Sequence, residues 1–213
     1  MQRALALSLI QVYADVSSNI KESSSKPILF FLDEPETFLH PRAQYKLLDA
    51  LEKISEKSQI FIVTHSPYLL RKFKKQSHSI HIFSKDCSFS TVKPGKSFDL
   101  FGLFSPTWGE INFFAFGVLS VEFHNELYGF IQAKAIFEDE KYYYENDFDE
   151  YLKRAGIPKD KPYIRLNKDG TTNNQPRTLP TFIRNVIHHP ENPYNSYTQG
   201  EHETSVNMLI QLL

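Results

Sequence analysis

Two short apolar runs constrain the fold of this 213-residue chain more than any other feature of its sequence. The runs are Ile28–Leu32 and Ile60–Val63, and both are bounded by polar or turn-forming residues. Unbroken apolar runs of this length are typical of strands that are buried on both faces of a parallel sheet. Leucine and isoleucine recur at helical spacing between residues 47 and 54, so the sequence predicts a strand–helix–strand crossover.

The pattern changes near residue 100. Before that point we also expect an amphipathic helix over residues 2–21, a short helix over 67–74, and two edge strands or a hairpin around residues 80–82 and 89–91. After that point no buried-strand run is found, and residues 158–177 have the Pro, Asn, Lys and Gly content of a loop. The expected helices cover residues 110–134 (as one helix or two), the surroundings of 148–152, 178–189 and 198–213. We therefore predict an α/β part over residues 1–100 and a mainly α-helical domain over 101–213.

Composition excludes several classes of function. A hydrophobic content of 41% permits a real core, and a formal net charge of -1 argues against global binding of a polyanion. The single cysteine, Cys87, excludes an internal disulfide and a cysteine-based zinc site. The longest weakly polar run, Ile111–Val121, is shorter than the roughly 18 residues that a membrane helix needs. We expect a soluble cytoplasmic protein with no membrane partner.

Two adjacent acids, Asp33 and Glu34, follow the first apolar run. Ligands of open α/β sheets bind at the carboxyl ends of strands, and acids that alternate in direction can take different roles. Asp33 would hold a Mg2+ ion beside nucleotide phosphates, and Glu34 would polarise an attacking water. His65 follows the second run and would reach the γ-phosphate or that water. The simpler alternative is a capping aspartate and a solvated histidine.

The order of these segments resembles the ABC-type ATPases of the SMC, OLD and recombination-repair class. Leu32–Glu36 is similar to the Walker B motif, Thr37–Pro41 to the D-loop, and Thr64–Pro67 to the switch-histidine loop. Gln2–Arg3 resembles the tail of a signature motif. The resemblance covers residues 1 to about 95. It implies that this part is the C-terminal portion of a parallel-sheet P-loop NTPase.

The same resemblance implies the cofactors ATP and Mg2+ and a head-to-tail homodimer or higher oligomer. Asp33 would bind Mg2+, Glu34 would act as general base, and His65 would sense the γ-phosphate. The sequence departs from the family in one respect, because it holds no Gly-x-x-x-x-Gly-Lys-Ser/Thr loop. That Walker A loop supplies the phosphate cradle, so we expect ATP hydrolysis only when another segment provides it. A fragment, a split ATPase and a degenerate remnant all fit, and a remnant would serve as a non-catalytic interaction platform.

A second motif lies in the helical part. Arg184 is followed by Asn185, and two histidines, His188 and His189, stand four and five residues after the arginine. The segment resembles the R-x4-H motif of HEPN ribonucleases, which are helical, metal-independent and usually dimeric. Histidine moves protons near neutral pH and arginine stabilises a phosphate transition state. The structural alternative is a helix end whose histidine interacts with the helix dipole.

ABC ATPases with helical C-terminal additions also resemble bacterial anti-phage defence proteins, among them Septu-like and retron-associated ATPases and anticodon nucleases. In these proteins the ATPase gates a nuclease that is fused to it or carried by a partner. The resemblance therefore implies an ATPase module in anti-phage defence, with an effector nuclease subunit and a nucleic acid as expected partners.

Overall fold

A computed structural model describes residues 28–56, 58–71, 73–74, 76–86, 89–94, 98–167 and 169–213. Its contacts divide the chain into two units, Met1–His78 and Ser79–Leu213, so the division falls earlier than residue 100. The predicted helix over residues 2–21, the resemblance of Gln2–Arg3 to a signature tail, and Cys87 lie outside the described residues.

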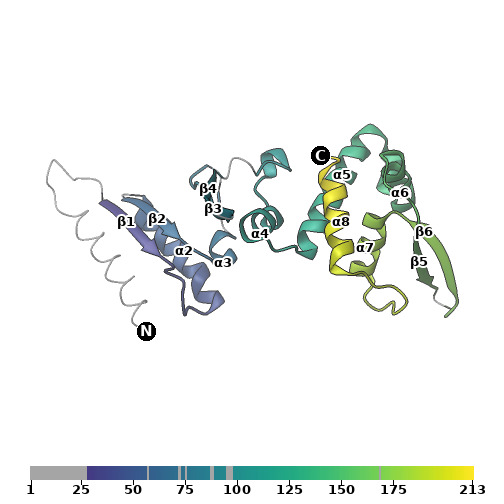
Figure 1. Ribbon diagram of the computed structural model, residues 1–213, viewed down its shortest axis with the longest axis horizontal. Helices are drawn as coiled ribbons and strands as arrows, with labels where there is room; N and C mark the ends of the chain where they lie inside the picture. Colours follow the sequence, from purple (N-terminus) through teal and green to yellow (C-terminus); the bar gives the residue numbers. More distant parts are fainter. Residues whose placement is uncertain are drawn as a thin grey trace. The chain divides into compact units, whose positions relative to one another are not determined.

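The N-terminal unit contains the predicted crossover. Strand β1 (Ile28–Asp33) pairs in parallel with β2 (Ser58–Val63), and helix α2 (Pro41–Ser55) joins them (Figure 1). The register sets Asp33 opposite Val63. Helix α2 begins with a proline in its first turn, which costs no hydrogen bond there. A single helical turn, α3 (Pro67–Leu70), follows β2.

One face of this small sheet is covered and the other is open. The leucines and the isoleucine of α2 are buried, with Leu69, against the alternate side chains Phe30, Leu32, Ile60 and Ile62. Leu29, Phe31, Phe61 and Val63 point to the opposite face, where Phe31 is 74% exposed and its ring stacks on that of Phe61 at 4.8 Å. The prediction of burial on both faces is therefore wrong for the part of the chain that the structure describes, because only one layer of helix packs on the sheet there.

The C-terminal unit is mainly helical, with two antiparallel hairpins (Figure 1). Its elements are β3 (His81–Asp86), β4 (Phe89–Pro94), η2 (Gly102–Phe104), α4 (Trp108–Phe116), α5 (Val121–Glu138), η3 (Glu140–Tyr143), α6 (Glu145–Arg154), β5 (Lys161–Leu166), β6 (Thr172–Arg177), α7 (Leu179–His188) and α8 (Gln199–Ile210). Of the two alternatives for residues 80–82 and 89–91, edge strands or a hairpin, the structure has antiparallel pairing of β3 with β4, and residues 110–134 fall in two helices.

The loop predicted for residues 158–177 is the β5–β6 hairpin instead. Strand β6 has the sequence Thr-Asn-Asn-Gln-Pro-Arg, which lacks the apolar alternation by which strands are identified. The hairpin is held by the pairing of its two strands, by its turn, by contact with α7 and by the loop after α7, where Asn195 Oδ1 accepts from the Ile164 N–H at 2.9 Å. Asn167 donates its backbone N–H to the carbonyl oxygen of Thr171 at 2.8 Å, and the Tyr163 ring packs edge-on against Phe182 of α7. Tertiary packing thus overrides a weak local preference.

Helix α5 is the centre of the C-terminal unit. It contacts α4, α6, α7 and α8, and its residues Phe123, Leu127, Tyr128, Ile131 and Ala135 are buried. A polar seam crosses this core between α5, α7 and α8. His124 Nε2 lies 2.9 Å from Ser205 Oγ, and Tyr128 OH lies 3.2 Å from Thr181 Oγ1. Burial lowers the pKa of His124 to about 3, and burial also lowers the pKa of His202.

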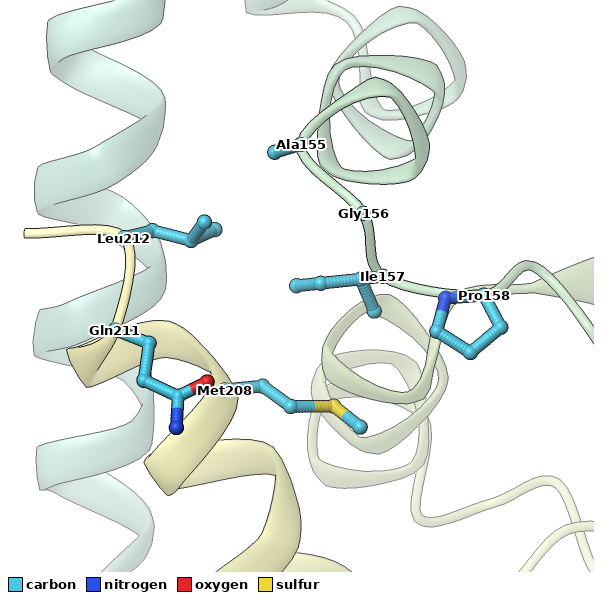
Figure 2. A pocket seen from close by; sticks show the side chains of 7 residues that line it. All are labelled: Ala155, Gly156, Ile157, Pro158, Met208, Gln211 and Leu212. Carbon is cyan, nitrogen blue, oxygen red and sulfur yellow. The ribbon is translucent and has the colours of Figure 1, made fainter.

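A pocket of about 330 Å³ lies in this unit between the end of α6 and the end of α8 (Figure 2). Ile157 and Leu212 point toward each other across it, and Gln211 is its one polar side chain. The lining holds no acid, base or nucleophile, so the pocket offers no catalytic chemistry. Among the described residues, no helix is both long enough and apolar enough to cross a membrane.

We predict that Gly109→Ala destabilises the C-terminal unit by about 1–3 kcal/mol, because overpacking costs energy of this order. A Cβ atom at Gly109 would lie 2.7 Å from the Cα atom of Phe123, and backbone cannot move aside cheaply. Gly129→Ala in α5 is the matched control, since nothing lies within 4 Å of its Cβ position. That change should stabilise the chain by about 0.5–1 kcal/mol. Urea unfolding measures both, and equal effects of the two substitutions would contradict the packing described here.

We also predict that the chain loses stability as the pH falls from 6.5 to 5. The folded-state pKa values of His124 and His202 lie below the unfolded value of 6.5. The unfolded chain therefore binds more protons below pH 6.5, whereas stability is fully retained above it. Each histidine adds up to about 1.4 kcal/mol per pH unit to the slope of the free energy of unfolding against pH. Urea unfolding at several pH values should give a shallower slope for His124→Gln, and identical slopes for the variant and the parent chain would contradict this origin.

Candidate functional site

The carboxyl ends of β1 and β2 bring three predicted residues to one edge of the sheet. The Glu34 N–H donates to the carbonyl oxygen of Val63 at 2.8 Å, so the pairing continues one residue past Asp33. His65 follows β2 by two residues, and its Nε2 lies 3.8 Å from Glu34 Oε1. The structure thus brings Glu34 and His65 together, with Asp33 next to Glu34 in the chain.

The backbone of Glu34 has an unusual conformation. Its φ angle is +42°, in the left-handed region that costs a non-glycine residue roughly 1–2 kcal/mol. Glu34 therefore leaves the strand at a turn, whereas the sequence suggested that Asp33 and Glu34 diverge by the alternation of a strand. Strained residues of this kind gather at functional sites, where the surrounding structure enforces them.

The site is open to solvent and partly ordered by hydrogen bonds. Asp33 is exposed, and the side chains of Glu34 and His65 are 44% and 83% exposed. Thr37 Oγ1 donates to Glu34 Oε2 at 3.0 Å and so limits the rotation of that carboxylate. From the sequence, Thr37 is placed only in the segment that resembles a D-loop, although its position three residues after Glu34 in a turn could have indicated this contact.

These residues fit one half of a magnesium–nucleotide site. Mg2+ prefers oxygen ligands and is commonly bound by one or two carboxylates together with phosphate oxygens and water. Asp33 offers such a carboxylate at the edge where ligands of parallel sheets bind. Across the described ranges, no group of three or more His, Cys, Asp or Glu side chains is placed to hold a metal ion. Asp33 would be the residue of this site that holds a Mg2+ ion.

A chain of hydrogen bonds links the loop after β1 to the loop after β2. The Thr64 hydroxyl donates to Glu36 Oε1, and the Ser66 N–H donates to Thr64 Oγ1 at 3.0 Å. Ser66 Oγ donates to Gln44 Oε1 at 2.6 Å, and Gln44 Nε2 donates to the carbonyl oxygen of Leu39 at 3.1 Å. No local sequence pattern predicts these contacts, because the partners lie up to 28 residues apart.

The second predicted site lies at the end of α7. The Arg184 guanidinium stacks over the Tyr128 ring at 4.8 Å, and its Nη1 lies 3.9 Å from Glu145 Oε2. Asn185 is buried and donates to Glu145 Oε1 at 3.1 Å, so its side chain is engaged in joining α7 to α6. Arg184 is thereby positioned by two neighbouring helices, α5 and α6.

The two histidines of this site differ in environment. Burial lowers the pKa of His188, and the charges of Arg184 and His189 lower it further. His189 follows the last residue of α7, its side chain is 54% exposed, and its Nδ1 lies 3.1 Å from Glu191 Oε1. Glu191 was not predicted as part of the site, although its position two residues after His189 places it within reach.

Comparison with known proteins finds a similarity that covers about a third of the chain. The family described as "AAA domain, putative AbiEii toxin, Type IV TA system" matches residues 1–71. The Old nuclease of Escherichia phage P2 is 39% identical over 70 residues, which are 32% of this chain and 12% of that protein. The chain therefore spans about an eighth of the relative it matches. No solved structure matches the chain. Residues 1–71 are thus similar to AAA-type ATPases of the OLD-like class.

Proposed function

We propose that this chain supplies the Walker B, D-loop and switch-histidine part of an ATP-hydrolysing module. One observation carries the proposal. The ends of two adjacent parallel strands set Glu34 and His65 3.8 Å apart, directly after the exposed carboxylate of Asp33. The site would supply an acid for the metal ion, a second acid for the attacking water and a histidine for the terminal phosphate.

Each residue has a distinct role in this proposal. Asp33 holds a Mg2+ ion, which when bound neutralises charge on the phosphate oxygens. Glu34 accepts a hydrogen bond from the attacking water and is oriented by Thr37. His65 donates to the γ-phosphate from the end of the neighbouring strand. Glu34 and His65 therefore approach the water and the phosphate from the same edge of the sheet.

The phosphate cradle comes from a segment outside this sequence. We use "ATP-competent assembly" for this chain together with the segment that supplies its Walker A loop. We further propose a head-to-tail dimer of such assemblies that gates or drives an effector in anti-phage defence, with a nuclease subunit and a nucleic acid as partners. The similarity of 70 residues of this chain to the Old nuclease of a phage, beside the AAA-domain match, supports a link between ATP hydrolysis and nucleic-acid cleavage.

Glu34→Gln should lower the turnover of ATP by about 10²–10⁴-fold in the ATP-competent assembly, because the amide cannot accept a proton from water. ATP binding should be retained, since Glu34 is not expected to hold the phosphates. Steady-state hydrolysis and equilibrium nucleotide binding measure the two effects.

Glu52→Gln is the matched control, because Glu52 lies in the same unit on α2 and pairs with Lys74 away from the strand ends. Full turnover by Glu34→Gln would contradict the role of Glu34. If the parent assembly does not hydrolyse ATP, the alternative of a non-catalytic interaction platform is the better account.

A second candidate function is cleavage of RNA at the end of α7. The observation that favours it is the pairing of His189 Nδ1 with Glu191 Oε1, which leaves Nε2 of an exposed imidazole available for proton transfer. Arg184, at the surface of the same helix, would stabilise the charge of a phosphate undergoing attack. A dimer would bring two such sets together, as in HEPN ribonucleases.

The double substitution Arg184→Ala with His189→Ala should reduce RNA cleavage by at least about 10²-fold, because both the proton carrier and the charge stabiliser are lost. Arg165→Ala, on the exposed part of β5, is the control for loss of positive charge. Cleavage of a labelled RNA is measured beside thermal unfolding, since Arg184 also packs on Tyr128. Unchanged cleavage by a folded double variant would contradict this function.

A further inference from the structure

We infer that Glu36 and Thr64 form a latch that positions His65 against Glu34. The latch deepens the proposed ATPase function, and its catalytic meaning rests on that function. Glu36 and Thr64 are positioning residues in this account, because they act through His65 and touch neither nucleotide nor water themselves.

The latch joins two loops that carry the reacting residues. Glu34 and Glu36 lie on the loop between β1 and α2, and Thr64 and His65 lie on the loop after β2. The hydrogen bond from the Thr64 hydroxyl to Glu36 Oε1 ties the first loop to the second. Each end of this bond is close in sequence to one member of the Glu34–His65 pair, so the bond sets their separation.

The orientation of His65 depends on the Thr64–Glu36 hydrogen bond because its own side chain makes only weak contacts. The imidazole is 83% exposed, and its recorded contact with Glu34 is a 3.8 Å approach rather than a hydrogen bond. An exposed contact at this distance contributes little and does not fix the orientation of the ring. The position of the His65 side chain therefore depends on its backbone, which Thr64 and Ser66 hold on either side.

Ser66 extends the latch into helix α2. Its N–H donates to Thr64 Oγ1 at 3.0 Å, and its hydroxyl donates to Gln44 Oε1 at 2.6 Å. Gln44 in turn donates to the backbone carbonyl of Leu39, at the end of the loop that began with Glu34. The hydrogen bonds thus form a closed circuit through both loops, and hydrogen bonds in such a circuit reinforce one another.

Burial shows that Glu36 has a different role from Glu34. Glu36 is 5% exposed, so attacking water cannot reach it as it reaches Glu34. Its Oε2 atom is buried and has no hydrogen-bond partner among the described residues, which makes the bond at Oε1 the main interaction holding the carboxyl group there. Loss of the Thr64 hydroxyl would leave a buried acid without this partner, which is unfavourable.

Thr64→Val tests the latch because valine keeps the shape of threonine and removes the hydroxyl. In the ATP-competent assembly we expect kcat to fall about 10- to 100-fold with little change in KM for ATP, since a displaced His65 affects the reacting phosphate more than nucleotide binding. Thr64→Ser keeps the hydroxyl and Glu36→Gln keeps an accepting oxygen. The kcat of both variants should therefore stay within about threefold of the parent value. Glu36→Ala should behave like Thr64→Val.

A double-substitution cycle separates positioning from a general structural effect. If Thr64 acts through His65, Thr64→Val should lower kcat by less than about twofold when His65 is already alanine, because contacts that work as one unit are not additive. An equal loss in the parent and in the His65→Ala background would overturn the latch. So would an unchanged kcat in folded Thr64→Val.

Amide hydrogen exchange in the 213-residue chain gives a readout that needs no ATP. The Ser66 amide donates to Thr64 Oγ1, and Glu36 accepts from the same hydroxyl, so the exchange of this amide should quicken at least about tenfold in Thr64→Val and in Glu36→Ala and stay near the parent rate in Thr64→Ser. Unchanged exchange in either Thr64→Val or Glu36→Ala would overturn the latch. If the parent assembly has no ATP turnover, the proposed function fails while this measurement still decides whether the latch exists.

Discussion

The parallel pairing of β1 with β2, and its continuation through the hydrogen bond from Glu34 to Val63, is the interaction on which the N-terminal site depends. In a parallel pair the carboxyl ends of both strands meet at one edge. A shift of one residue in the register would move His65 away from Glu34 and would also turn Phe30 and Leu32 away from α2. The burial of these apolar side chains therefore fixes the geometry of the polar residues that follow them.

Part of the N-terminal unit could be predicted from the sequence. The crossover was predictable because β1 and β2 are apolar runs and α2 repeats its leucines at helical spacing. The grouping of Asp33, Glu34 and His65 followed from topology alone. The left-handed turn at Glu34 could not be predicted, because a glutamate carries no signal for positive φ. The bond between Thr64 and Glu36 joins residues 28 positions apart, and no local pattern marks it.

The C-terminal unit could be predicted only in part from the sequence. Its helices were predictable from their apolar spacing, whereas β6 was not, because its side chains are polar and its stability comes from the pairing with β5 and the packing of β5 on α7. The polar seam of His124, Tyr128 and Ser205 inside the core also escaped prediction, since a histidine on an apolar helix face carries no sign of its partner. That seam lies beneath Arg184, which stacks on Tyr128, so core packing determines where the surface arginine is held.

The most direct test of the central claim is paramagnetic line broadening by Mn2+ bound with ATP in the ATP-competent assembly. We predict that the NMR signals of Asp33, Glu34 and His65 broaden first, because Mn2+ would replace Mg2+ beside Asp33. The signals of residues at the amino ends of the same strands, such as Ser58, should broaden less at the same concentration. Broadening that spares the ends of β1 and β2, or that reaches all signals alike, would contradict a metal–nucleotide site at this edge of the sheet.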